Sequence, residues 1–134
     1  MNLFIPEIGT LLTLNKEWSF TLYPEYRNQK LGKVLGVYKE KQTPNGPSFR
    51  WFDGDKELAH HNAQEYNRDT GEWEWVVTYP LVFVPGTQLR VDRIYIRKGS
   101  SEYSSVSFWI KSGPYKGKRF WAKLEDVNTI NFNL

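Results

Sequence analysis

The sequence has no cysteine, one methionine and two histidines among its 134 residues. Without cysteine, a disulfide framework, a thiolate zinc site and a cysteine nucleophile are all excluded. Long hydrophobic segments are missing too, because nowhere do eighteen apolar residues follow one another and no basic stretch precedes an apolar one at the N-terminus. We therefore expect a cytoplasmic protein that does not span a membrane.

The signatures of catalysis are also missing. There is no glycine-rich phosphate loop and no Gly-x-Ser-x-Gly elbow. His60 and His61 lie in a stretch with four carboxylates, Asp53, Asp55, Glu57 and Glu65. Adjacent histidines diverge on a strand or a helix and rarely share one metal ion, and no nucleophile stands at a recognisable spacing. We predict that the protein is not an enzyme and that it has no metal site and no cofactor. A hydrolase that uses His60 and His61 is the least favoured alternative.

Aromatic residues are abundant, at 16% of the chain with six Trp and eight Tyr, and the short apolar runs are rich in residues that favour strands. The sequence therefore predicts an all-β fold. In the C-terminal part, alternation predicts strands at 105–111 and 119–124, separated by a turn with glycines at 113 and 117. A short helical turn at 125–128 and a last strand at 130–134 follow.

The N-terminal part is less regular. We predict strands at 18–23, 33–38 and 48–52, the last after an Asn45-Gly46 turn. The polar stretch 53–72 is expected to be a loop insertion with one helical turn within 56–66. Strand character resumes at 73 and runs to 84 with a break at Pro80, because proline cannot donate a hydrogen bond to a central ladder.

A weak internal repeat organises the chain, since residues 9–20 resemble residues 86–97. Both copies begin with Gly-Thr shortly after a proline. We therefore predict an N-terminal β-module at 1–76 that carries the polar insertion, and a C-terminal β-module at 77–134. The first has nine Lys/Arg against eleven Asp/Glu, a charge of −2; the second has nine against four, a charge of +5.

The predicted element order over residues 85–134 is Pro-Gly-Thr, strand, loop, strand, hairpin, strand, helical turn and last strand. It resembles an SH3-like barrel of the KOW or Tudor sort, and the first repeat copy is interpreted as a second such module packed in tandem. The dense aromatics and small size are also similar in style to accessory proteins of tailed phages. The resemblance does not decide the function, because such barrels host nucleic-acid binders, peptide binders and plain scaffolds.

Alternate residues of a strand point to opposite faces of its sheet, so the C-terminal strands can be sorted into two faces. One face is apolar, with Ile94, Ile96, Val106, Phe108, Ile110, Phe120, Ala122 and Leu124. The other face interleaves cations with aromatic rings, which suits phosphates and bases. Together with two basic turns, it gives the candidate nucleic-acid-binding residues Arg93, Tyr95, Arg97, Lys98, Trp109, Lys111, Tyr115, Lys116, Lys118, Arg119, Trp121 and Lys123.

Each candidate surface has a structural alternative. The rings of Tyr95, Trp109 and Trp121 can instead pack against the N-terminal part, and the basic turns can be ordinary solvated turns. In Glu72-Trp73-Glu74-Trp75, alternation places the two rings on one face with Val77 and Tyr79, either as core or as an aromatic, anionic surface for a cationic partner segment.

We favour binding of DNA or RNA without sequence-specific readout, because no recognition helix or zinc finger is visible. The rival is a protein interaction module or inhibitor that docks on a host or partner protein through Trp, Tyr and Arg. The affinity of a nucleic-acid complex should fall steeply as the salt concentration rises, whereas that of a protein complex should not.

Overall fold

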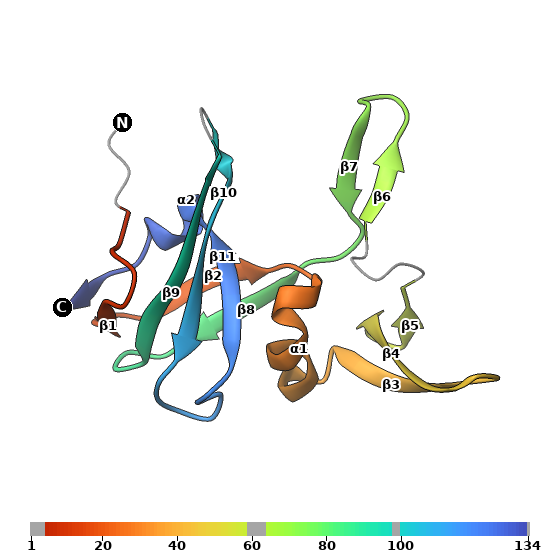
Figure 1. The fold of residues 1–134 in the computed structure, drawn as a ribbon, viewed down its shortest axis with the longest axis horizontal. Helices are drawn as coiled ribbons and strands as arrows, with labels where there is room; N and C mark the ends of the chain where they lie inside the picture. The colour runs from red at the N-terminus through yellow and green to blue at the C-terminus, as the bar shows by residue number, and fades with distance from the viewer. Residues whose placement is uncertain (1–4, 59–63, 98–99, 134) are drawn as a thin grey trace. The chain divides into compact units, whose positions relative to one another are not determined.

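A computed structural model of the chain describes residues 5–58, 64–97 and 100–133 (Figure 1). Most of these residues lie in strands, which confirms the all-β class. The chain forms two compact units: unit 1 comprises Met1–Leu22 with Pro80–Leu134, and unit 2 comprises Tyr23–Tyr79. These units differ from the predicted division after residue 76, because the first 22 residues group with the C-terminal strands. No helix in the described parts of the chain is long and apolar enough to cross a membrane.

Unit 1 is built on a five-stranded sheet with the order β11-β10-β9-β1-β12. Its strands are β1 (Leu11–Leu14), β9 (Gln88–Arg97), β10 (Ser100–Ile110), β11 (Arg119–Lys123) and β12 (Phe132–Asn133), with the four-residue helix α2 (Leu124–Val127) before β12. Within the described residues β11 and β12 are the two edges, so hydrogen bonding does not close this sheet into a barrel. The predicted strand, turn, strand, helical turn and last strand after residue 104 are all present.

The two copies of the internal repeat lie side by side in unit 1, because β1 pairs with β9 in the antiparallel sense. The amide of Gly9 donates to the carbonyl of Val91 at 2.8 Å, and the amide of Gly86 donates to the carbonyl of Leu14 at 2.7 Å. A shift of 77 residues converts the first bond into the second, so the pairing has local two-fold symmetry. The repeat therefore marks two partner strands of one unit and not the beginnings of two modules.

The core of unit 1 lies between this sheet and a second, two-stranded sheet of β2 (Trp18–Leu22) and β8 (Tyr79–Phe83). Figure 1 shows β2 and β8 running in opposite directions across the strands of the larger sheet. Trp18 and Phe20 stack with ring centroids 4.2 Å apart, and Phe20 and Phe108 each stack on Phe120 at 5.2 and 5.5 Å. Such contacts between rings stabilise the core beyond the effect of burying their apolar surface. The predicted apolar face is thus core along β10 and β11, whereas Ile96 of β9 is exposed.

The described residues of unit 2 form a 3-10 helix, one α-helix and five strands. Its elements are the 3-10 helix η1 (Tyr26–Asn28), α1 (Gln29–Leu35), β3 (Tyr38–Thr43), β4 (Gly46–Asp53), β5 (Lys56–Glu57), β6 (Gln64–Asn67) and β7 (Glu72–Trp75). Strands β3, β4 and β5 form one sheet, and β6 and β7 form a separate hairpin. The strand predicted at 48–52 is present as part of β4. The helical turn predicted within 56–66 is wrong for residues 56–57 and 64–66, which lie in strands β5 and β6. Residues 59–63 of this range lie outside the described residues.

The strand predicted at 33–38 is also wrong, because α1 occupies residues 33–35 and β3 begins only at Tyr38. Two glycines explain the helix. Gly36 takes a left-handed conformation with φ of 77°, which ends the helix in the manner common for glycine. At Gly32 an added Cβ would lie 2.6 Å from Cζ3 of Trp51, so only glycine allows the helix to approach this ring. Val34 therefore belongs to the helix, and Val37, which follows the helix, packs against the buried side chains of Trp51 and Leu58.

The core of unit 2 is small and centres on the buried side chains of Trp51 and Leu58. Tyr79 packs on Trp51 with ring centroids 5.9 Å apart, and its hydroxyl donates a hydrogen bond to the carbonyl of Phe52 at 2.7 Å. Burial, with a smaller contribution from the negative charge of Asp53, raises the pKa of Tyr79 to about 12. This tyrosine therefore stays protonated and hydrogen-bonded well above neutral pH.

Candidate functional site

Strand register brings four of the predicted basic and aromatic residues onto the outer face of β9, β10 and β11, which is the face opposite the apolar core. Ser105 of β10 pairs with Tyr95 of β9 and with Lys123 of β11, and the next serine on the same side pairs with Arg93 and Trp121. Directly paired residues project to the same face of a sheet. The sorting of side chains by alternation therefore places these four predicted residues together.

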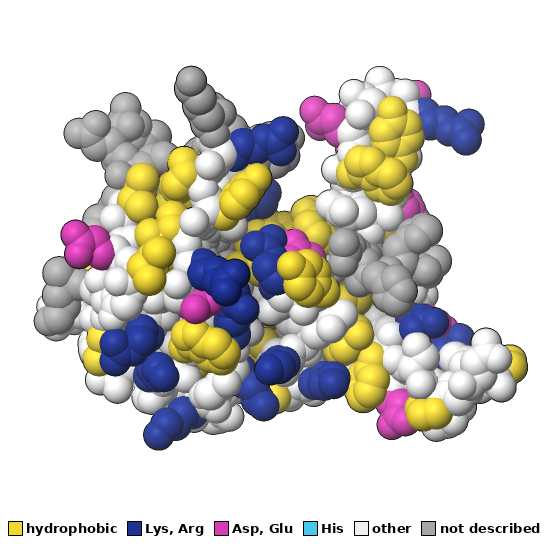
Figure 2. Space-filling model, viewed as in Figure 1, with side chains coloured by type: hydrophobic (Ala, Val, Ile, Leu, Met, Phe, Trp, Pro, Cys, Tyr) yellow, Lys and Arg dark blue, Asp and Glu magenta, His cyan; other side chains and the backbone are white. Residues whose placement is uncertain are grey.

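Tyr95 is the most accessible aromatic ring of this face, with 59% of its surface exposed. Arg93 and Arg97, two positions to either side on β9, are also exposed. Figure 2 shows Lys and Arg side chains gathered over β9, β10 and β11, with hydrophobic side chains between them. The exposed part of the face thus combines a flat ring with flanking cations.

Other predicted residues of the face are less available. Trp121 is only 6% exposed, so its ring cannot serve as a stacking platform. Tyr115 is half-buried, with its ring centroid 6.3 Å from that of Phe83 in the core of unit 1. Lys98 lies outside the described residues. The ring of Trp121 is therefore buried and that of Tyr115 packs on the core of unit 1.

Asp92, which was not among the predicted residues, organises the end of the face nearest the β10–β11 turn. Its carboxylate accepts hydrogen bonds from the indole nitrogen of Trp109 at 3.1 Å and from the hydroxyl of Ser107 at 3.3 Å. It also forms an ion pair with Nε of Arg119 at 2.7 Å, and the Arg119 guanidinium lies 5.9 Å from the centroid of the Trp109 ring. Trp109 and Arg119 are therefore held in place by one carboxylate.

A register shift explains how Asp92 reaches this face. Phe108 of β10 pairs with Val91, but the preceding Ser107 pairs with Arg93, which leaves Asp92 as an extra residue on β9. Such irregularities redirect a side chain relative to simple alternation. The signal in the sequence was a lone acidic residue between two arginines, Arg90 and Arg93, in an otherwise basic strand.

The basic turn between β10 and β11 is ordered by backbone hydrogen bonds. The amide of Ile110 donates to the carbonyl of Lys118 at 2.9 Å, and the amide of Lys111 donates to the carbonyl of Gln88 at 2.8 Å. The side chains of Lys111 and Lys116 are exposed, whereas Lys118 is half-buried. The turn therefore presents two cations from a fixed backbone.

The positive charge of the chain belongs to unit 1. This unit contains ten Lys/Arg and six Asp/Glu, a formal charge of +4, whereas unit 2 contains eight and nine, a formal charge of −1. The charges of the two units add to the +3 of the whole chain. An anionic ligand is therefore attracted to the unit that carries Tyr95 and its flanking arginines.

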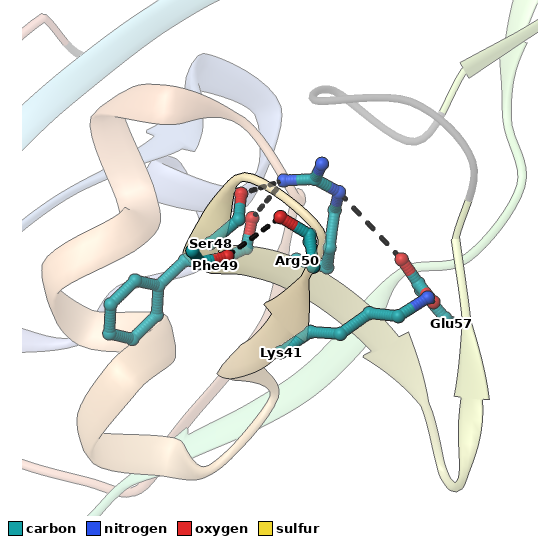
Figure 3. Close-up of polar contacts among 7 residues, drawn as sticks. Lys41, Ser48, Phe49, Arg50 and Glu57 are labelled. Carbon is teal, nitrogen blue, oxygen red and sulfur yellow. Dashed lines mark hydrogen bonds and ion pairs between the residues drawn. The ribbon is translucent and has the colours of Figure 1, made fainter.

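A polar cluster on the three-stranded sheet of unit 2 is structural. Glu57 of β5 forms ion pairs with Lys41 of β3 and, at 3.7 Å, with Arg50 of β4 (Figure 3). Arg50 also donates hydrogen bonds to the hydroxyl of Ser48 and to the carbonyl of Phe49. These contacts tie the three strands of the sheet together, and the carboxylate is already matched by two cations.

Within the described residues there is no group of three or more His, Asp or Glu side chains that could hold a metal ion. His60 and His61 lie outside them. No protein-family model, curated protein or solved structure matches this chain.

Proposed function

We propose that this protein is a non-enzymatic nucleic-acid-binding protein that uses the outer face of β9 and the adjacent β10–β11 turn. The observation that carries the proposal is the exposed ring of Tyr95 between the exposed side chains of Arg93 and Arg97. A protein that binds single strands without sequence preference combines cations that follow the phosphates with rings on which bases stack. One strand of this sheet presents both kinds of group on the same side.

The remaining cations extend this surface in two directions. Lys123 lies two strands away in the row of Tyr95, and the exposed Lys111 and Lys116 stand at the turn. Phosphate contacts of this kind position a nucleic acid but do not read its sequence. The ligand is therefore DNA or RNA bound through its backbone and its unstacked bases.

The SH3-like resemblance remains part of the proposal. The order of β9, β10, β11, α2 and β12 agrees with the order on which the resemblance rests. Strand β1 lies between β9 and β12 in the sheet, so the unit that we compare with such a barrel includes residues from both ends of the chain. On this interpretation unit 2 is an insertion into a single SH3-like module.

The first test measures the binding of a fluorescently labelled single-stranded oligonucleotide to the full chain by anisotropy. Stacking on an aromatic ring contributes about 1–3 kcal/mol per base, so Tyr95→Ala should weaken binding about 5-fold to 150-fold. Tyr95→Phe keeps the ring and should bind normally. Tyr66→Ala, which removes an exposed tyrosine of unit 2, is the matched control. Equal binding by wild type and Tyr95→Ala would refute the proposed site.

A second test addresses the phosphates through the salt dependence of the same complex. Each phosphate contact contributes a slope of about −0.7 to log affinity against log salt for a single strand. The double variant Arg93→Ala/Arg97→Ala should therefore make the slope shallower by about 1.4, on every sequence alike. A weakened complex with an unchanged slope would assign binding to contacts other than phosphates.

A further inference from the structure

The β6–β7 hairpin of unit 2 carries an exposed pair of aromatic rings. Tyr66 of β6 lies opposite Trp73 of β7, with ring centroids 5.5 Å apart. Trp73 is 64% exposed and Tyr66 is 52% exposed. Of the two alternatives for Trp73, a core residue or part of a surface, the structure therefore favours the surface. Figure 2 shows hydrophobic side chains gathered on this hairpin, with acidic side chains at its margins. Trp and Tyr are the residues most enriched at the centres of protein interfaces.

The opposite face of the hairpin is acidic. Glu65 lies directly opposite Glu74, and Asn67 lies opposite Glu72. Like charges directly opposite each other destabilise a pair of strands. Among the residues that the structure describes, no lysine or arginine forms an ion pair with these three glutamates. The range 64–75 contains four acidic residues and one arginine, a charge of −3 in a chain whose net charge is +3.

The hairpin also has two strand edges without a neighbour among the described residues, because β6 and β7 pair only with each other. An isolated two-stranded hairpin is at best marginally stable in water, and it gains stability from a third strand. An extended peptide can add to such an edge through main-chain hydrogen bonds, while its alternate side chains contact the two faces. Here one face offers rings and the other offers carboxylates.

We propose that the β6–β7 hairpin binds an extended, basic segment of a partner protein, in which Lys or Arg alternates with apolar residues. The segment adds to the edge of β7. Its cations lie beside Glu72 and Glu74 and relieve the repulsion between Glu74 and Glu65. Its other side chains cover Trp73 and Tyr66. This site is separate from the proposed nucleic-acid site, since it has the opposite charge and lies in the other unit.

The test uses the full, isotopically labelled chain and a ten-residue synthetic peptide in which lysine alternates with valine and threonine. We expect amide NMR shifts at 64–75 on titration. Glu72→Gln/Glu74→Gln should weaken the complex about tenfold and flatten its salt dependence. Trp73→Ala should weaken it by about 30-fold or more, which is the loss expected when an interface hot spot is truncated. Trp73→Phe, which preserves a ring opposite Tyr66, should bind with an intermediate affinity if the Ala variant loses the hairpin.

Two controls distinguish this site from attraction by charge alone and from binding at unit 1. A peptide of the same composition with its lysines clustered cannot place cations and apolar groups on opposite sides, and it should bind at least fivefold more weakly. Tyr95→Ala should leave peptide binding unchanged, so a failed nucleic-acid proposal does not affect this one. The proposal is overturned if the shifts map outside 64–75, if the clustered peptide binds equally well, or if the double Gln variant keeps full affinity.

Discussion

Asp92 offers a sharp test of the proposed function, because its replacement should move stability and affinity in opposite directions. The carboxylate accepts hydrogen bonds from Trp109 and Ser107 and holds Arg119 in an ion pair. In Asp92→Asn, the amide oxygen can still accept from the indole of Trp109, and the amide nitrogen can donate to Ser107. The charge that holds Arg119 is lost.

The stability loss should be modest. The side chains of Arg119 and Asp92 are 30% and 20% exposed, which is intermediate between a surface pair and a buried one. Surface pairs contribute up to about 1 kcal/mol and disruption of a buried pair costs about 3–5 kcal/mol, so we expect about 1–2 kcal/mol. Urea denaturation measures this loss, with an unchanged m-value if the fold is retained.

The affinity for a single-stranded oligonucleotide should rise. Arg119 becomes available for a phosphate, and one further contact makes the salt slope steeper by about 0.7, which corresponds to about fivefold tighter binding at 0.1 M salt. Glu17→Gln is the matched control, because it removes one exposed carboxylate of the same unit and changes the net charge equally. If both variants change the salt slope alike, the change in net charge explains the effect and a new contact of Arg119 does not. If Asp92→Asn leaves the affinity unchanged, the outer face of β9–β11 is not the site.

Three further predictions follow from burial, ionisation and topology. Trp121→Ala should lower the free energy of unfolding by about 3–5 kcal/mol in urea denaturation, because it removes a buried tryptophan. Tyr79→Phe should cost about 1 kcal/mol at pH 7 by losing the hydrogen bond to Phe52. Because the folded-state pKa of Tyr79 is raised to about 12, its stabilisation is complete below about pH 10 and is lost as pH rises toward 12, so the Phe variant should lack this part of the alkaline transition in a pH titration of stability. Replacement of residues 23–79 by a short Gly-Ser turn between the antiparallel β2 and β8 should leave a folded unit 1 that retains oligonucleotide affinity by anisotropy; an unfolded product, seen by circular dichroism, would contradict the independence of this unit.

Part of the candidate site could be predicted because alternation along a strand is local. Period-two patterns in three segments assign Tyr95, Ser105 and Lys123 to the same face of the sheet, so the membership of this face could be predicted. The role of Asp92 could not, because it depends on one extra residue in the pairing of β9 with β10. Local sequence does not reveal which residue of one strand lies opposite a given residue of another.

The all-β class, the C-terminal series of strand, turn, strand and helical turn, and the concentration of cations there were determined by the sequence itself. Each depends on composition or on side-chain patterns within a few residues. Only the tertiary structure decided that β1 belongs beside β9, that unit 2 is inserted between β2 and β8, and that Trp121 is buried while Tyr95 is exposed. These features depend on contacts between segments far apart in the chain, and their free energy comes from surfaces that meet only after folding.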